Sequence, residues 1–370
     1  MTWELWLGIV AVVLAAAALV VALLIYRRLH TSGPADPVSP AADVDTHRDL
    51  VAFVANPSKP EVAAFEEVAR RACREAALPD PLWIETTVDD PGVGQAREAI
   101  ERGADVVVAV GGDGTVRAVA EALTGTGVPM ALVPSGTGNL LARNLDIPVG
   151  DRAAALRILV GGVDRTIDVG WARVTRWADE PGDAADDGAT PGGEGDKHIF
   201  LVIAGLGFDA AMVADADDDL KAKMGWVAYF VAGVKHLHGK RMRTRITVDD
   251  RGTVVARLRT ILIGNCGRLP GGINLIPDAV IDDGILDLAA IDTRGGLAGW
   301  AQLFGEVVMQ GFGMRNDLPA KIGRIDHTRA QRVVVEVEGG EQAQVDGDVI
   351  GRAAELEAWV EPKALVVRTA

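Results

Sequence analysis

The strongest constraint on the fold is a regular alternation of short apolar runs and amphipathic stretches between residues 49 and 165. The apolar runs predict strands at 50–54, 83–87, 105–110 and 130–133, and the amphipathic stretches predict helices at 61–77, 95–102, 116–123 and 139–144. Continuous apolar strands that alternate with helices are typical of a parallel sheet covered by helices on both faces. Residues 49–165 are therefore predicted to form a three-layer α/β domain.

From residue 166 onward the pattern changes, and strand-like runs are separated by Gly, Pro and Asp. These runs lie at 198–203, 245–249, 257–264 and 286–291, with helices expected at 220–238 and 298–311. The acidic, Gly-rich segment 179–196 lacks the apolar residues needed to fold, so we predict a disordered loop there. Residues 166–370 are predicted to form a second, mainly β domain, and a return of the C-terminal segment to the first domain is left open.

The N-terminal segment carries no charge between Glu4 and Arg27. As a helix it would reach about 33 Å, enough to span a bilayer, so residues 5–26 are predicted to be a transmembrane helix. A signal peptide is the alternative, but it would have a basic stretch before the apolar run. The basic residues after the run predict a single-pass cell-membrane protein with cytoplasmic catalytic domains, joined to its anchor by a flexible linker over 29–48.

Charge and cysteine content exclude some classes of function. The chain has 37 Lys and Arg against 52 Asp and Glu, a net charge of −15. This sign repels phosphate backbones and argues against nucleic acid as a partner. The two cysteines, Cys73 and Cys266, are too few for a disulfide framework.

A glycine-rich loop follows the third expected strand, where Val110 leads directly into Gly111-Gly112-Asp113-Gly114-Thr115 and then a helix. Glycines let backbone N–H groups approach a phosphate, and the start of the helix adds a partial positive charge. A plain tight turn is the alternative interpretation. The spacing is neither the dinucleotide-binding fingerprint nor a Walker loop.

A second glycine turn, Pro134-Ser135-Gly136-Thr137-Gly138-Asn139, follows the fourth expected strand. Open α/β sheets bind ligands at the carboxyl ends of their strands, so the two turns are expected to line one crevice. Asn56 and Thr87 follow the first and second strands and are expected at the same edge, although each could serve only as a cap or turn residue.

Together these motifs resemble the diacylglycerol kinase catalytic-domain family, which includes sphingosine and ceramide kinases and bacterial lipid kinases. The resemblance extends to later motifs, namely Gly205-Leu206-Gly207-Phe208-Asp209, Pro277-Asp278-Ala279, Asp282-Asp283-Gly284-Ile285-Leu286-Asp287 and Val345-Asp346-Gly347-Asp348. It implies that the second domain is a β sandwich.

The resemblance also implies transfer of the γ-phosphate of ATP to a lipid hydroxyl, with diacylglycerol as the first acceptor to consider and phosphatidic acid as its product. The implied cofactors are ATP and Mg²⁺, and the implied partners are a membrane lipid and the bilayer, while a homodimer is left open. The positions implied to contact the nucleotide are Asn56, Thr87, Gly111, Gly112, Asp113, Gly114, Thr115, Val116, Arg117, Ser135, Gly136 and Thr137.

By the same resemblance the general base is Asp348, where many relatives carry Glu. A carboxylate suits this role because the attacking hydroxyl needs a proton acceptor within reach. From the residues alone, Asp346-Gly347-Asp348 is better explained as a hairpin turn.

For metals, the resemblance implies a structural magnesium held by Asp283 and the carbonyls of Val280 and Ile285, since hard oxygen ligands suit magnesium. Asp283 as a plain turn residue remains the alternative. A second magnesium would arrive with ATP, near Asp113.

The sequence departs from the family pattern after the first glycine loop. Relatives often have Asn-Glu where this chain has Arg117-Ala118. Arg117 could itself meet a phosphate. Two other functions stay open, namely a kinase of a soluble acceptor, similar to NAD kinases, and a noncatalytic nucleotide-binding regulator.

Overall fold

The computed structural model describes residues 49–58, 62, 64–178, 197–207, 241–268, 276, 278–293 and 323–370. All of them belong to one compact unit, which spans Arg48–Ala370. Several predicted features lie outside the described residues, namely the transmembrane helix 5–26, the linker 29–48, the loop 179–196 and the helices 220–238 and 298–311.

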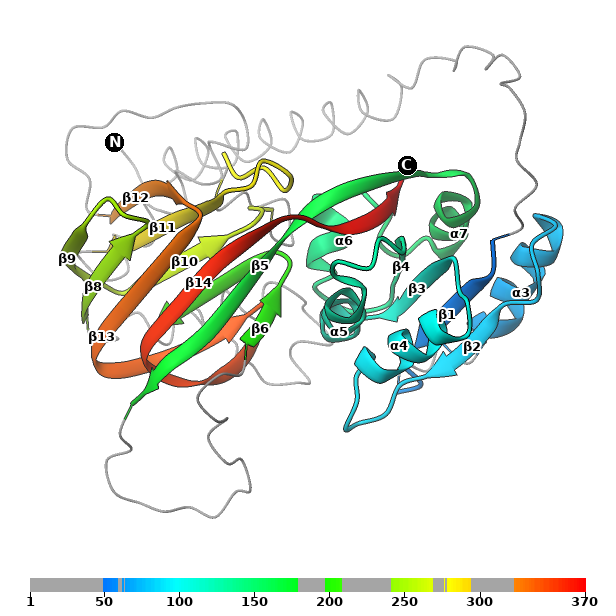
Figure 1. Ribbon diagram of the computed structural model, residues 1–370, viewed down its shortest axis with the longest axis horizontal. Coiled ribbons are helices and arrows are strands. Elements are labelled where there is room, and N and C mark those ends of the chain that lie inside the picture. Colours follow the sequence, from blue (N-terminus) through cyan, green and yellow to red (C-terminus); the bar gives the residue numbers. More distant parts are fainter. Residues whose placement is uncertain are drawn as a thin grey trace, which may run out of the picture. The chain divides into compact units, whose positions relative to one another are not determined.

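Helices and strands alternate in the first half of the described chain, and strands alone follow. In chain order the elements are β1 (Val51–Ala55), α3 (Phe65–Glu75), β2 (Leu82–Glu85), α4 (Val93–Glu101), β3 (Val106–Gly111), α5 (Asp113–Leu123), β4 (Met130–Pro134), α6 (Leu140–Asn144), α7 (Arg152–Gly161), β5 (Val163–Trp177), β6 (Lys197–Phe200), β7 (Ile203–Gly207), β8 (Met242–Val248), β9 (Thr253–Leu258), β10 (Thr260–Gly264), β11 (Leu286–Thr293), β12 (Gly323–Ala330), β13 (Arg332–Val345) and β14 (Asp348–Thr369). The predicted two-domain architecture, an α/β domain followed by a β-rich domain, is confirmed (Figure 1).

The α/β domain is built on four parallel strands in the order β2-β1-β3-β4. Alternate residues of each strand face opposite sides, because side chains along a strand have a period of two. In β1, Phe53 packs in a cluster with α3 and α7, whereas Val54 packs in the cluster that contains α4 and α5 residues. Both faces of the sheet are therefore covered, which explains why β1, β3 and β4 are apolar throughout.

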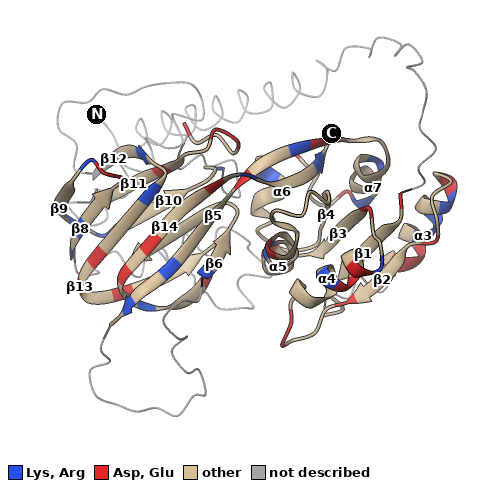
Figure 2. Cartoon of the chain, in the orientation of Figure 1, with Lys and Arg blue, Asp and Glu red and all other residues tan. Residues whose placement is uncertain are grey.

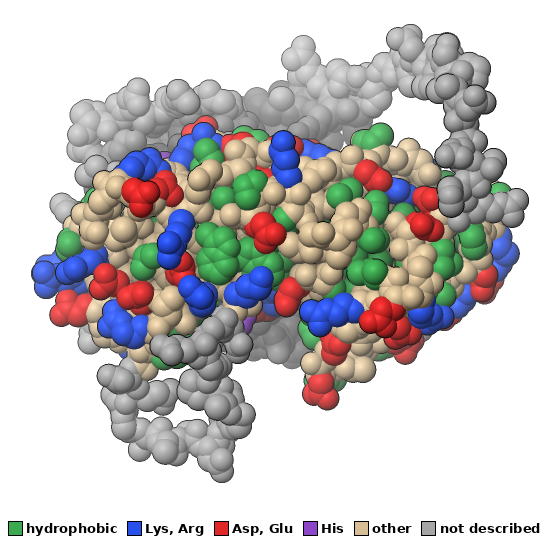
Figure 3. Space-filling model, in the orientation of Figure 1, with side chains coloured by type: hydrophobic (Ala, Val, Ile, Leu, Met, Phe, Trp, Pro, Cys, Tyr) green, Lys and Arg blue, Asp and Glu red, His purple; other side chains and the backbone are tan. Residues whose placement is uncertain are grey.

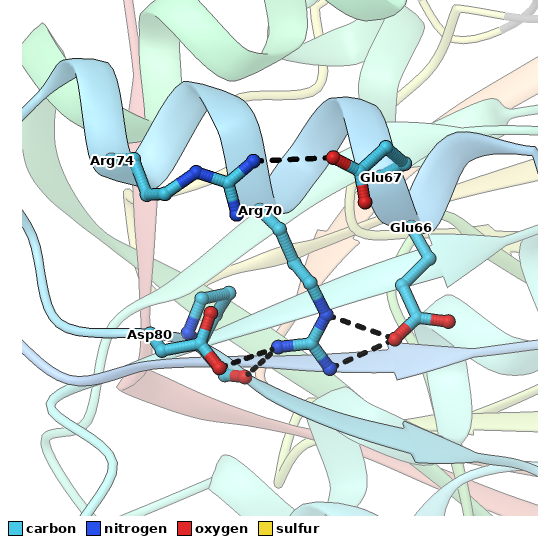
Figure 4. Close-up of polar contacts among 6 residues, drawn as sticks. Glu66, Glu67, Arg70, Arg74 and Asp80 are labelled. Atoms are coloured by element: carbon cyan, nitrogen blue, oxygen red, sulfur yellow. Dashed lines mark hydrogen bonds and ion pairs between the residues drawn. The ribbon is translucent and has the colours of Figure 1, made fainter.

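Helix α3 is tied to the start of β2 by Arg70 (Figure 4). The guanidinium donates to Glu66 Oε1 one turn earlier and to Asp80 Oδ2 beyond the end of the helix, at 2.8 and 2.9 Å. It also donates to the carbonyl of Pro81 at 3.1 Å. These contacts fix the chain reversal between α3 and β2.

The β-rich domain is organised around β13, which pairs antiparallel with β7, β8 and β14. Its core contains Phe200, Leu206, Ile261, Val335 and Leu356, which are almost fully buried. Two of the expected strands are each divided in the structure. The run 198–203 becomes β6 and β7, and the run 257–264 becomes β9 and β10 on either side of Arg259.

Strand β14 belongs to both domains. Its first part pairs with β13, and its last part pairs with β5 and lies parallel to β4 at Val367 and Met130. Leu365 and Val367 are fully buried in the same cluster as the helices α4 and α5. The α/β sheet is therefore extended by the C-terminal strand (Figure 1).

Charged side chains of both signs are interspersed over the described elements. Figure 2 shows Lys and Arg near Asp and Glu along β13, β14 and α3, and the face drawn in Figure 3 shows the same mixing. Many of these residues form ion pairs, such as Arg368 with Asp164 at 2.8 Å. The face in view therefore shows charges of both signs mixed together, without separate zones of one sign.

The predicted localisation is corrected. In the part of the chain that the structure describes, no helix is long and apolar enough to cross a membrane. The longest described helices, α3 and α5, have 11 residues each and would reach about 16 Å, about half the thickness of a hydrocarbon core. This finding contradicts the prediction of a single-pass cell-membrane protein.

Candidate active site

The carboxyl ends of the parallel strands lie level with one another, which places the predicted motifs at one edge of the sheet. Ala55 of β1 is in register with Val110 of β3, and Gly111 of β3 is in register with Pro134 of β4. The two glycine turns and Asn56 therefore leave the sheet side by side.

The two glycine turns are in direct backbone contact. A Cβ atom on Gly136 would lie 2.6 Å from the Cα atom of Gly112, so a side chain there would push the turns apart. The Ser135 amide donates to the carbonyl of Gly111 at 2.8 Å. A Cβ atom on Gly111 would likewise meet the side chain of Thr115 at 2.6 Å. These glycines are needed for close packing of the turns.

Asn56 and Thr87 have different positions relative to these turns. The Asn56 amide nitrogen Nδ2 lies 3.5 Å from Thr115 Oγ1, and Thr115 is buried. Thr87 instead shapes the turn before α4, because its hydroxyl accepts from the Asp90 amide at 3.0 Å. The structure thus joins Asn56 to the first glycine loop and gives Thr87 a turn-forming contact.

The first glycine loop carries a carboxylate that is already engaged. Both oxygens of Asp113 accept backbone N–H groups at the start of α6, from Asn139 at 2.8 Å and from Leu140 at 2.6 Å. Burial is the main cause that raises the pKa of Asp113 to about 6, and the charge of Asp346 adds to it, while the two amides act in the opposite direction. Asp113 therefore links one glycine turn to the other, and its expected place near a magnesium ion that arrives with ATP stays a prediction.

Asn139 completes the second turn, although its side chain was not among the predicted site residues. Its backbone adopts a left-handed conformation with φ of 48°. The side-chain Oδ1 accepts from the Gly136 amide at 3.0 Å, and Nδ2 donates to the Gly136 carbonyl at 2.6 Å. Asn adopts the left-handed conformation more readily than most residues. The Asn at the end of the motif was therefore a sequence signal for this turn. Ser135 is half-buried and Thr137 is exposed at the same turn.

Asp348, the predicted general base, lies beside the first glycine loop although it belongs to the β-rich domain. A Cβ atom placed on Gly114 would lie 3.8 Å from Asp348 Oδ2. Arg117 of α5 donates to the same oxygen at 2.5 Å and to the Val345 carbonyl at 2.9 Å. The Asp348 side chain is 59% exposed and that of Arg117 is 19% exposed. A carboxylate from one domain thus reaches the first glycine loop of the other.

The neighbouring Asp346 is structural. Its two carboxylate oxygens accept three backbone N–H groups, from Leu201 at 2.7 Å, Val202 at 2.9 Å and Ile203 at 2.8 Å. Burial raises the pKa of Asp346, while Arg117 lowers it. This network holds the turn that carries Asp348, and sequence reasoning did not assign it.

Comparison with known proteins agrees with this geometry. A family model for the diacylglycerol kinase catalytic domain matches residues 53–172, and a model for the YegS C-terminal NAD kinase beta sandwich-like domain matches residues 202–369. A protein of Mycobacterium tuberculosis named "Diacylglycerol kinase" is 31% identical over 253 residues, which are 68% of this chain and 72% of that protein. The chain belongs to the diacylglycerol kinase catalytic-domain family.

Other members of the family support the match. The Pseudomonas aeruginosa protein named "Probable lipid kinase YegS-like" is 33% identical over 251 residues, 65% of this chain and 70% of that protein. A solved structure described as a diacylglycerol kinase from Bacillus anthracis shares the fold, with a TM-score of 0.65 at 20% identity, and covers 88% of this chain and 99% of that chain. Because the family consists of kinases, ATP is the implied phosphate donor.

Asp283, which is expected from the family resemblance to hold a structural magnesium, makes two contacts with protein groups in this structure. Its Oδ1 accepts from the Ile285 amide at 3.1 Å, and its Oδ2 pairs with the guanidinium of Arg329. Val280 is 45% exposed. Over the described ranges, no group of three or more His, Cys, Asp or Glu is arranged to hold a metal ion. Arg329 supplies a positive charge at this turn, and the magnesium expected at Asp283, Val280 and Ile285 stays a prediction.

Proposed function

We propose that the protein is a lipid kinase that transfers the γ-phosphate of magnesium-bound ATP to a lipid hydroxyl, with diacylglycerol as the first acceptor and phosphatidic acid as its product. The observation that carries the proposal is the position of the exposed carboxylate of Asp348 beside the Gly111–Thr115 loop. Membership of the kinase family and the names of the relatives support the lipid acceptor.

The nucleotide loop suits the triphosphate in an acidic protein. The backbone N–H groups at the start of α5 point away from the helix, where the partial positive charge of the helix dipole favours a phosphate. Close packing of Gly112 against Gly136 keeps both turns small, so a phosphate can approach the backbone. Binding at this edge would bring the γ-phosphate toward the turn that carries Asp348.

In the proposed mechanism, the acceptor hydroxyl attacks the γ-phosphorus in line with the leaving oxygen. Asp348 accepts the hydroxyl proton as the new P–O bond forms, and ADP leaves with its magnesium. Most of the rate enhancement would come from positioning and from charge stabilisation by the loop amides. Magnesium enters as part of the ATP substrate.

The test is transfer of labelled γ-phosphate from ATP to defined lipids in mixed vesicles, resolved by chromatography. We expect a labelled product from diacylglycerol that is absent with Asp348→Ala, while ATP affinity changes little. Asp250→Ala is the matched control, because Asp250 is exposed in the β8–β9 turn away from the site.

Other outcomes point to other functions. Label only in water-soluble products would favour a soluble acceptor, and tight ATP binding without transfer would favour a noncatalytic regulator. Full activity of Asp348→Ala would overturn the base assignment.

A further inference from the structure

Arg117 is the side chain that connects the nucleotide loop to the proposed base. It lies near the beginning of α5, the helix that follows the first glycine loop. Its Nη1 donates to the Val345 carbonyl at 2.9 Å and its Nη2 to Asp348 Oδ2 at 2.5 Å. The two acceptors flank the turn between β13 and β14, so the planar guanidinium of Arg117 binds both sides of that turn.

We propose that Arg117 is a positioning residue that fixes Asp348 against the nucleotide loop by holding the Val345 carbonyl and the Asp348 carboxylate together. This inference rests on the proposed function. It deepens that function by naming what sets the base in place.

Burial supports the positioning role. The Arg117 side chain is 19% exposed, whereas Asp348 is 59% exposed. An exposed carboxylate has several rotamers open to it, and a mostly buried guanidinium with fixed fork geometry restricts them. The contact engages Oδ2 of Asp348, and a carboxylate has a second oxygen, Oδ1, with which to accept a proton.

The turn is held firmly from the other side as well. Asp346 accepts three backbone N–H groups from residues 201–203, and the amide of Gly347 donates to Gln344 Oε1 at 2.8 Å. The backbone of the turn is thus anchored in the β-rich domain, while the side chain of Asp348 is oriented from the α/β domain. Lysine could not reproduce this arrangement fully, because an ammonium lacks the planar fork.

A direct phosphate contact is the competing role for Arg117. A guanidinium carries five N–H donors, and the two contacts above leave donors that could face a nucleotide. The two roles predict different kinetics. Loss of a positioning residue lowers kcat and leaves ATP affinity unchanged, whereas loss of a phosphate ligand weakens ATP binding.

The experiment compares Arg117→Ala, Arg117→Lys and the control Arg102→Ala, which removes an exposed arginine at the end of α4. With labelled transfer to diacylglycerol vesicles, we expect Arg117→Ala to lower kcat on the order of 100-fold, because small displacements of a reacting group are costly. The Kd for ATP should stay within about 2-fold of wild type, and Arg117→Lys should recover part of kcat. A large loss of ATP affinity with kcat retained would overturn the proposal.

A second measurement does not depend on activity. Unfolding midpoints in urea are compared for Arg117→Met, Asp348→Asn and the double variant. If the side chains hold each other, the double variant loses clearly less than the sum of the two single losses. Additive losses would overturn the proposal. If the losses are coupled but the wild-type protein transfers no phosphate to lipid, the proposed function is wrong and the contact between Arg117 and Asp348 still holds.

Discussion

The turns at 346–348 and 282–284 both place two aspartates and a glycine beside an arginine, yet they differ in where that arginine comes from. Asp348 pairs with Arg117 of the α/β domain, 231 residues away in sequence. Asp283 pairs with Arg329, 46 residues away on a strand of its own domain. In the first turn a carboxylate is linked to helix α5 of the α/β domain, and in the second it is linked to the neighbouring strand β12.

The local networks explain this difference further. Asp346 anchors the first turn through three backbone N–H groups, which leaves Asp348 to project toward the other domain. In the second turn Arg329 contacts both Asp283 and Asp287, and Arg329 and Asp287 are directly opposite each other on β12 and β11. Similar residues can therefore serve either the proposed chemistry or the stability of the sheet, depending on which arginine pairs with the carboxylate.

The largest effect is expected from removing the buried carboxylate of the first turn. Asp346→Ala leaves three buried N–H groups without acceptors, at about 1 to 3 kcal/mol each, so the free energy of unfolding should fall by roughly 3 kcal/mol or more. Asp283→Ala should cost only about 1 kcal/mol, because its ion pair is partly exposed. Urea unfolding of both variants tests this contrast, and equal losses would break the comparison.

The next effect concerns Asp113, whose carboxylate lies near Asp346. Its pKa is raised from 3.8 to about 6 in the folded protein, so the folded state binds more protons than the unfolded state between these values. The stability that Asp113 contributes is complete below about pH 4 and is lost as the pH rises to about 6, by about 2 to 3 kcal/mol.

Unfolding of wild type and Asp113→Asn across this range measures the effect. The difference in unfolding free energy, wild type minus variant, should decrease as the pH rises from about 4 to about 6. A difference that stays constant or increases would show that Asp113 ionises normally.

A smaller effect is expected at the second turn. Asp287 is buried, and its Oδ2 has no hydrogen-bond partner among the described residues. Arg329→Met removes the cation that pairs with this carboxylate. We expect a loss of about 1 to 2 kcal/mol. Millimolar magnesium should leave the thermal midpoint of the wild-type protein unchanged and should restore part of the variant's loss. Magnesium that stabilises only the wild-type protein would contradict the role assigned to Arg329.

The smallest effect is expected from Arg165→Met. It removes the ion pair with Asp282 at 2.7 Å, in which both side chains are partly exposed. Such pairs contribute about 0 to 1 kcal/mol. Thermal unfolding of Arg165→Met is compared with that of Arg329→Met. We expect the smaller loss of stability for Arg165→Met, because its ion pair does not neutralise a buried carboxylate. Equal losses for the two variants would contradict this distinction.

Much of the α/β domain could be predicted from sequence because its signals are local. The apolar run before Gly111 and the glycines after it specify a strand, a turn and a helix within a short segment. The alignment of Gly111 with Pro134 followed from a general property of parallel sheets. The family prediction is confirmed on these same motifs.

The contacts that complete the site depend on distant residues and could not be predicted. Neither the pairing of Arg117 with Asp348 nor the engagement of Asp113 by the Asn139 amide follows from sequence spacing. The ion pair of Asp283 could not be predicted for the same reason, since Arg329 comes from another strand. The roles of Asp348 and of the other predicted site residues stay predictions, as do the domain boundaries.

Strand β14 also has a consequence for the order in which the protein can form during synthesis. The carbonyl of Ala364 accepts from the Gly125 amide at 2.8 Å, and Leu365 and Val367 fill the core beneath α5. A ribosome releases these residues only after the entire β-rich domain has been made. The α/β domain, although translated first, therefore reaches its final packing last, and its apolar core stays partly exposed until the C-terminal strand has been made.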